Sequence, residues 1–428
     1  MSSKFLSHVA AVALVLIASA SLSSAQDSCS PIDLRIAPTF DIGANVSRSV
    51  MADFNGDGKI DVGVVNFDQR TVSVLNGDGA GGFAPGRAFP TTTNAYSIAA
   101  ADLNNDSKID IVAGSGQQNQ LAILINTGTG FQAPVMYTAP SNFEFQDLQS
   151  GDFNGDGKAD IAAIRNQQNR QLDIFLGNGQ GSLTFATSLN LTGGESVMEV
   201  GNLNGDAFTD IIVSGGSSST ARNISFMYGA AGGNFSLTFG FNVLEKPVGF
   251  SIARLNGDPS PDFVVAFEDT TTPTQPFIKP YLSGLGSFVP GTAIEPPYFL
   301  APWDVTTGDY NGDGHQDIAA PLGGHLVMVI YGRGNGEFQD PSHWAMQTNG
   351  RSIFSQDLNA DGKIDLITTQ QVFALNNGMA VLTNLGGGKF NAPKAVLWGL
   401  SQISAEDFNN DDLLDFVSSR KSDFVSES

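Results

Sequence analysis

The 428-residue chain has few cysteines and few basic residues. Cys29 is the only cysteine, which excludes an internal disulfide. Lysine and arginine together number 21 against 43 aspartate and glutamate residues, and the net charge of −22 argues against a nucleic acid as the partner. Stability therefore has to come from packing or from a bound group that compensates the acidic side chains.

The chain also lacks the common signatures of catalysis. It contains no Gly-x-Ser-x-Gly string, no phosphate-binding glycine loop and no His-Glu-x-x-His string. His315, His325 and His343 lie at no metal-ligand spacing. The residues therefore predict no catalytic site, and we expect a protein that is not an enzyme.

Residues 1–25 have the layout of a secretory signal peptide. Lys4 precedes an apolar run over residues 9–20, and small residues up to Ala25 suit a cleavage site. The run is too short for a membrane anchor, and no other stretch could cross a bilayer. We expect a secreted or extracytoplasmic protein, with a short N-terminal segment over residues 26–35 and one domain over residues 36–428.

The acidic residues gather in a loop motif that returns along the chain. In residues 53–61, oxygen-bearing side chains stand at positions 1, 3, 5 and 9, and glycines stand where the loop has to turn tightly. Several oxygens from one short loop, with a backbone carbonyl at position 7, are what Ca²⁺ requires. The eight copies hold 22 aspartates at positions 1, 5 and 9, so the negative charge of the chain is concentrated in these loops.

Six copies are intact, and we predict a calcium site in each. The predicted ligands, with position 7 contributing only its backbone carbonyl, are Asp53, Asn55, Asp57, Lys59 and Asp61; Asp102, Asn104, Asp106, Lys108 and Asp110; Asp152, Asn154, Asp156, Lys158 and Asp160; Asp309, Asn311, Asp313, His315 and Asp317; Asp357, Asn359, Asp361, Lys363 and Asp365; and Asp407, Asn409, Asp411, Leu413 and Asp415. A further copy begins with asparagine and leaves a seventh site open, with the residues Asn202, Asn204, Asp206, Phe208 and Asp210.

The remaining copy begins with a cation. Arg254 stands at position 1, and we expect its guanidinium to neutralise Asp258 and Asp262 in place of a metal ion. An EF-hand is excluded for the intact copies, because that loop needs an acidic residue at position 12. Position 12 here is Val64, Ala113, Ala163, Ala320, Thr368 or Ser418. Calcium is therefore predicted to be structural, joining two strands.

The copies start 49, 50, 50, 52, 55, 48 and 50 residues apart, which is the period of a repeated supersecondary unit. In the first unit, residues 47–52 lead into the loop and residues 60–65 leave it as an apolar strand. Residues 71–75 alternate apolar and polar side chains, and a glycine-rich turn then leads through Phe83-Ala84-Pro85 to a fourth strand. Four short strands per unit predict an all-β fold, a β-propeller with four-stranded blades.

Counting loops predicts eight blades, and seven remains open if one unit forms no blade of its own. Residues 36–40 resemble a fourth strand without partners, and the last repeat, after Asp407, lacks a fourth strand. We therefore expect the N-terminal strand to complete the last repeat and to close the ring, because closure removes exposed strand edges.

These loops, with the glycine-rich turn and the Phe-x-x-Pro that follow them, resemble the FG-GAP/VCBS repeats of integrin α-like propellers and of secreted bacterial proteins. The resemblance spans about residues 36–428 and implies Ca²⁺ in the loop after the first strand of each blade. Some calcium-containing lyases of pectic polysaccharides resemble eight-bladed propellers, which keeps a secreted polysaccharide lyase as the alternative function.

The favoured function is a binding or adhesion module for an extracellular glycan or protein, acting as a monomer. The longest repeat carries proline-stiffened segments with three aromatic residues, and these are the predicted ligand contacts: Tyr298, Phe299 and Trp303.

Overall fold

The computed structural model of the chain describes residues 39–42, 46–139, 144–166, 170–191, 197–215, 222–233, 235–268, 275–284, 287–297, 300–346, 349–369, 378–392, 400–406 and 415–420. The predicted signal peptide and the segment over residues 26–35 lie outside these ranges. No α-helix occurs in the described residues, so none of them forms a helix that could span a membrane.

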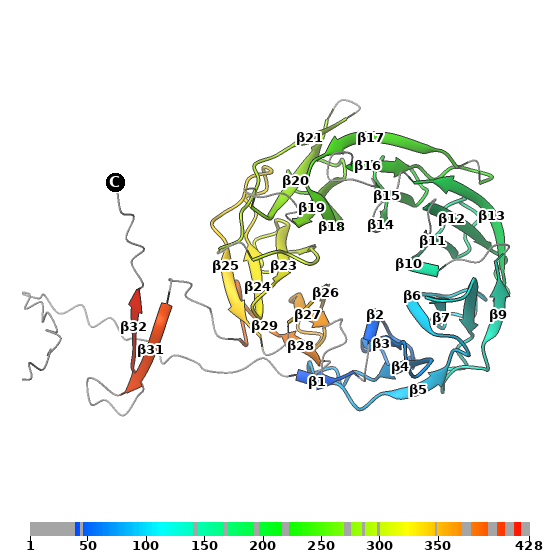
Figure 1. Cartoon of the computed structure of the whole chain (residues 1–428), viewed down its shortest axis with the longest axis horizontal. Helices are drawn as coiled ribbons and strands as arrows, with labels where there is room; N and C mark the ends of the chain where they lie inside the picture. The colour runs from blue at the N-terminus through cyan, green and yellow to red at the C-terminus, as the bar shows by residue number, and fades with distance from the viewer. Residues whose placement is uncertain are drawn as a thin grey trace, which may run out of the picture.

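Seven four-stranded antiparallel sheets follow one another around a ring (Figure 1). Six of them consist of four consecutive strands paired in chain order. They are β2 (Val46–Ala52), β3 (Asp61–Asn66), β4 (Thr71–Leu75) and β5 (Arg87–Pro90); β6 (Ala95–Ala101), β7 (Asp110–Ser115), β8 (Gln120–Leu124) and β9 (Val135–Thr138); β10 (Glu144–Gly151), β11 (Asp160–Asn166), β12 (Gln171–Gly177) and β13 (Leu183–Asn190); β14 (Met198–Gly201), β15 (Asp210–Gly215), β16 (Arg222–Met227) and β17 (Leu237–Val243); β18 (Lys246–Ala253), β19 (Asp262–Glu268), β20 (Phe277–Ser283) and β21 (Phe288–Pro290); and β22 (Thr306–Gly308), β23 (Asp317–Leu322), β24 (Leu326–Ile330) and β25 (Ser342–Ala345).

The seventh sheet joins two distant parts of the chain. Strands β26 (Ser352–Gln356), β27 (Asp365–Thr369) and β28 (Gly378–Leu382) take their fourth strand from β1 (Thr39–Asp41). Strand β1 is antiparallel to β28, with Phe40 opposite Met379. The N-terminal strand thus completes a blade, but the predicted partner in the last repeat is wrong.

The described residues form seven blades, and the prediction of eight is wrong for them. The fourth-strand position of the seventh sheet is already taken by β1, and the last repeat contributes only β31 (Leu400–Glu406) and β32 (Asp415–Arg420), which pair with each other. A further hairpin of β29 (Asn384–Gly386) and β30 (Lys389–Phe390) follows β28. The alternative of seven blades therefore describes the ring.

The burial of each strand follows its side-chain pattern. The apolar second strand β3 is buried at every position, whereas the fourth strand β5 is mostly exposed. Strand β4 alternates along its first half, as its polar and apolar residues do. Second strands lie inside a sheet with a neighbouring blade on each face, so they need apolar side chains on both sides.

The core of the described residues is divided into seven apolar clusters, each of them shared by two neighbouring blades. The cluster between the seventh and first blades combines Ile367 and Val381 with Val62 and Val64. It includes Ile42, which follows β1 and is only 2% exposed. Packing between the first and seventh blades is therefore of the same kind as packing elsewhere in the ring.

Candidate functional site

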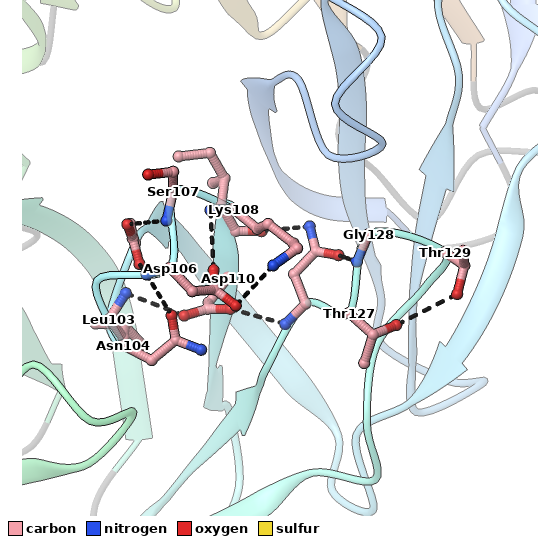
Figure 2. Close-up of polar contacts among 12 residues, drawn as sticks. Leu103, Asn104, Asp106, Ser107, Lys108, Asp110, Thr127, Gly128 and Thr129 are labelled. Carbon is pink, nitrogen blue, oxygen red and sulfur yellow. Dashed lines mark hydrogen bonds and ion pairs between the residues drawn. The ribbon is translucent and has the colours of Figure 1, made fainter.

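In each of the seven described blades the repeated loop connects the first and second strands, and the loop from Asp102 is representative (Figure 2). Asp102 Oδ1 accepts a hydrogen bond from the backbone N–H of Asp106 at 3.1 Å, and Oδ2 accepts one from Ser107 N–H at 2.8 Å. Asn104 Oδ1 also accepts from Asp106 N–H, at 3.0 Å. The side chains at positions 1 and 3 thus shape the loop by holding its own backbone.

The five intact loops that the structure describes turn through left-handed backbone at two positions. In the first loop these are Gly56 (φ 75°) and Gly58 (φ 81°), as expected from the glycine spacing. The Asp102 loop places Asn105 (φ 58°) and Ser107 (φ 66°) at the same points. Left-handed backbone is therefore a property of the loop, even where glycine is missing.

The aspartate at position 9 has a structural role that was not predicted. Asp110 is fully buried, and its two oxygens accept backbone hydrogen bonds from Leu103 N–H at 3.0 Å and Asn126 N–H at 2.7 Å. One donor lies in the loop and the other lies two residues beyond the end of the third strand, so the carboxylate ties the loop to the sheet (Figure 2).

This arrangement recurs in all seven described blades. The equivalent carboxylates are Asp61, Asp110, Asp160, Asp210, Asp262, Asp317 and Asp365, each 0% exposed. Burial raises the pKa of Asp160 and of Asp317 to about 6. The backbone N–H donors lower each pKa, and the other aspartates of the same loop raise it. The sequence contained one signal for this role. In the copy that begins with Arg254 no metal ion is expected, yet position 9 is still an aspartate, Asp262.

A lysine at position 7 pairs with the aspartate at position 5 in four loops. Lys108 Nζ lies 2.9 Å from Asp106 Oδ2, and Lys158 repeats the contact with Asp156 at the same distance. The hydrogen bond from Lys108 lowers the pKa of Asp106. The remaining two pairs are Lys59–Asp57 at 3.9 Å and Lys363–Asp361 at 2.7 Å. Only the carbonyl of position 7 was predicted to matter.

The donor chemistry of the loops fits a hard cation, because every predicted ligand is an oxygen. In the described residues no three acidic, imidazole or thiol side chains are grouped so that they could hold a metal ion. The carboxylates at position 1 are turned to backbone N–H groups, and those at position 9 are tied to the sheet. The loops thus carry the oxygen donors that Ca²⁺ requires. In this structure, however, these oxygens are directed at backbone N–H groups and do not converge on one point.

The two altered loops keep the turn through amide groups. Asn202 Oδ1 accepts from Gly205 N–H at 2.6 Å, and its Nδ2 donates to the Asp206 carbonyl. In the other loop Arg254 is exposed, and within the described residues no ion pair joins it to Asp258 or Asp262. The expected neutralisation by Arg254 is wrong.

Local groups satisfy these two carboxylates instead. Asn256 Nδ2 donates to Asp258 Oδ2 at 2.9 Å, while Asp262 accepts from the backbone N–H and the hydroxyl of Ser283. Four of the predicted ligands of the last loop, Asp407, Asn409, Asp411 and Leu413, lie outside the described residues, and Asp415 begins β32.

Of the predicted ligand contacts, Tyr298 and Phe299 lie outside the described residues. Trp303 lines a central cavity of about 460 Å³ that is bordered by the first strands of all seven blades. The Arg351 guanidinium lies over its indole ring, 3.9 Å from the ring centroid. Trp303 therefore belongs to the centre of the ring and not to a peripheral loop.

The same cavity holds charged groups that sequence reasoning missed: Arg48, Asp147, Glu199 and Asp304. Arg48, Asp147 and Asp304 each stand five residues before the first residue of a metal loop, a shared repeat position that could have identified them. Burial raises the pKa of Glu199 to about 8 and that of Asp304 to about 7, and neighbouring carboxylates add to both shifts.

Comparisons with known proteins address the family and the fold. A family model described as FG-GAP-like repeat matches residues 53–113, 102–163, 152–213 and 254–320, together more than half of the chain. No curated protein sequence matches. The chain is similar in structure to the BP39L lectin from Burkholderia pseudomallei, with 14% identity, a TM-score of 0.57, and coverage of 83% of this chain and 100% of that chain. It is also similar to BBS1N, crystallised in complex with ARL6DN, with 12% identity, a TM-score of 0.55, and coverage of 82% and 97%.

Proposed function

Because the chain belongs to the FG-GAP-like repeat family, we propose that it is a secreted β-propeller, stabilised by calcium, that binds a glycan or protein ligand as a monomer. The observation that carries the proposal is the central cavity, which combines an aromatic wall at Trp303 with carboxylates such as Glu199 and Asp304. Proteins bind small ligands in concave sites where a few placed polar groups fix the orientation of the ligand. One structural neighbour is a lectin and the other was crystallised with a protein partner, which agrees with a recognition role.

Calcium has the role of a structural ion in this proposal. Six loops would each hold one ion through positions 1, 3, 5 and 9 and the carbonyl of position 7, and the Asn202 loop is the open seventh site. Support comes from the all-oxygen donor sets and from the repulsion among carboxylates of one loop, since the charges of Asp57 and Asp53 add to the rise in the pKa of Asp61 that burial causes. When bound, the ion would compensate this charge and would bind only the folded loop.

We propose a binding protein and not an enzyme. A polysaccharide lyase, the alternative, would use a lysine, arginine, tyrosine or histidine base beside the substrate. Among the described residues that line the cavity there is no lysine, tyrosine or histidine, and the two arginines contact Asp147 and Trp303. Release of unsaturated products from pectic substrates would replace this proposal by the alternative.

A glycan array probed with the full chain, with calcium and with chelator, tests the function. We expect binding to a restricted group of glycans that weakens with chelator, because loss of calcium destabilises the blades that shape the cavity. Protein ligands are tested by crosslinking on intact cells. A folded, calcium-loaded chain that retains neither a glycan nor a protein contradicts the proposal.

A further inference from the structure

Asparagine followed by glycine occupies positions 3 and 4 in five of the seven loops that the structure describes. Glycine places no side chain beside its backbone nitrogen, so this nitrogen can reach the amide carbon of the preceding asparagine. Such pairs are where asparagine most readily loses its side-chain nitrogen as ammonia. The pairs are Asn55-Gly56, Asn154-Gly155, Asn204-Gly205, Asn256-Gly257 and Asn311-Gly312.

The five pairs share one backbone geometry. Their glycines are left-handed, with φ of 75°, 75°, 81°, 75° and 80° in chain order. In every pair the asparagine Oδ1 accepts a hydrogen bond from the backbone N–H of the aspartate at position 5, over 2.8–3.0 Å. The chain therefore contains five closely matched sites, and a difference between them has to come from their surroundings.

The surroundings differ at the N–H of the glycine. In four loops this N–H donates to the side-chain oxygen at position 1. The acceptors are Asp53, Asp152 and Asp309, each at 2.7 Å, and Asn202 at 2.6 Å. In the remaining loop position 1 is Arg254, a side chain that has donors and no acceptor. Gly257 is exposed, and its N–H donates to no described residue of the chain.

Deamidation uses the glycine nitrogen as its nucleophile. The Gly257 nitrogen attacks the side-chain carbonyl carbon of Asn256 and closes a succinimide ring. The bond from this carbon to Nδ2 breaks, and ammonia leaves with the proton that the Gly257 nitrogen gives up. Water then opens the ring at either carbonyl, which yields aspartate or isoaspartate. The reaction consumes only water, so the loop itself supplies every other group.

An acceptor on the glycine N–H opposes the first step. The nitrogen attacks as its proton leaves, so a hydrogen bond that holds this N–H has to be broken first. A carboxylate at position 1 also disfavours the negative charge that develops on the nitrogen, whereas the guanidinium of Arg254 favours it. The first effect protects four of the loops and the second protects three of these. Neither effect protects Asn256.

We propose that Asn256 is a site of spontaneous deamidation and that it reacts faster than the asparagine at position 3 of each matched loop. The reaction places a carboxylate beside Asp258, at the point where Asn256 Nδ2 now donates to Asp258 Oδ2 at 2.9 Å. A hydrogen bond is thereby replaced by repulsion between two carboxylates. This inference does not depend on the ligand that the propeller binds.

The modified loop lies at the junction of the fifth and sixth blades. The carbonyl of Leu255 accepts a hydrogen bond from Gly336 N–H at 3.1 Å, and Gly336 belongs to the turn between β24 and β25. Isoaspartate lengthens the main chain between residues 256 and 257, so the loop can no longer close with the same geometry and the Leu255 carbonyl is displaced. Deamidation should therefore loosen the contact between these two blades.

The test incubates the full chain in mildly alkaline buffer with chelator, so that no loop holds a metal ion. Digestion and mass spectrometry follow the replacement of each amide by an acid. We expect Asn256 to be converted about tenfold faster than the four matched asparagines, because a hydrogen bond to a charged acceptor is strong enough to change a rate by this factor.

Reciprocal variants separate the missing acceptor from other causes. Arg254→Asp supplies the oxygen and should slow the conversion of Asn256 about tenfold. Arg254→Met removes the cation without adding an acceptor, so Asn256 should remain the fastest of the five sites. Asp53→Ala frees the Gly56 N–H and should accelerate Asn55, whereas Asp57→Asn in the same loop keeps that contact and is the matched control.

Equal rates at the five asparagines, or unchanged conversion of Asn256 in Arg254→Asp, overturn the inference. Equal slowing by Arg254→Met and Arg254→Asp assigns the effect to charge and contradicts the role of the missing acceptor. Melting curves identify a variant that does not fold, and Asp309→Ala repeats the test of Asp53→Ala at Asn311.

Hydrogen exchange tests the effect on the junction. Exchange in the fifth and sixth blades should be faster in deamidated protein than in Asn256→Asp, which adds the charge without lengthening the main chain. Equal exchange in the two proteins contradicts the displacement of Leu255.

Discussion

Asp160 Oδ1 accepts a hydrogen bond from the backbone N–H of Gly177 at 2.8 Å, and this contact ties a loop to the end of the third strand in the same blade. The other oxygen accepts from Phe153 N–H at 3.1 Å. Both oxygens of one buried carboxylate thus accept hydrogen bonds from backbone N–H groups of the same blade. The same relationship repeats around the ring, which makes position 9 the fixed point of each repeat.

The first prediction follows from this contact. Asp160→Asn, measured in chelator, should lower the free energy of unfolding by about 1–3 kcal/mol, because its NH₂ group faces a buried N–H donor. Asp156→Asn changes an exposed carboxylate of the same loop, whose surface ion pair contributes about 0–1 kcal/mol. Chemical denaturation measures both. Equal losses in the two variants would contradict the role of position 9.

The second prediction concerns calcium. Millimolar Ca²⁺ should raise the melting temperature and chelator should lower it, because extracellular sites often have dissociation constants of about 10⁻⁴–10⁻³ M. Native mass spectrometry should count six ions, or seven if the Asn202 loop binds. Arg254→Asp restores position 1 and should add one ion. A melting curve indifferent to calcium would refute the metal-loop interpretation.

The third prediction concerns ring closure. Deletion of residues 33–42 removes β1, exposes the edge of β28 and uncovers the apolar cluster that includes Ile42. We expect aggregation or loss of cooperative unfolding, since an unpaired strand edge recruits other chains. The control is deletion of residues 26–32, which precede β1 and should have no effect on either. Size-exclusion chromatography and thermal melts compare the two, and a monomeric, equally stable 33–42 deletion would exclude this closure.

The fourth prediction is a pH dependence of stability. The folded-state pKa of Glu199 is about 8, above its ordinary value of 4.5, so the folded protein retains a proton that the unfolded chain releases. Stability from this group is therefore complete at acidic pH and decreases as the pH rises toward about 8. Asp304, with a pKa of about 7, acts in the same direction.

Glu199→Gln should flatten this dependence. At pH 8 the variant should be more stable than the parent by on the order of 1–3 kcal/mol, because a neutral amide replaces a carboxylate without a cation. At pH 5 the two proteins should be nearly equal. Unfolding free energies across the range measure the difference, and parallel pH curves would show that Glu199 titrates normally.

Local features of this chain were decided by its sequence alone. The 50-residue period, the four strands of a repeat and the loop turns depend on residues that are neighbours in the chain, such as Gly56 and Gly58. The buried second strands could be predicted for the same reason, because residues 62–65 contain no polar side chain. Family membership follows from the repeats as well.

Long-range pairing was decided only by the tertiary structure. Strand β1 pairs with β28, more than 300 residues away, and not with the last repeat, because register between such distant segments depends on the space left in the closed ring. The central cavity has the same origin. Asp147, Glu199 and Asp304 lie in different repeats and converge only when seven first strands surround one axis. The aspartate at position 9 depends on both the sequence and the fold. Its spacing in the sequence predicts an oxygen ligand for a metal ion, and the fold directs its oxygens toward backbone N–H groups of the same blade.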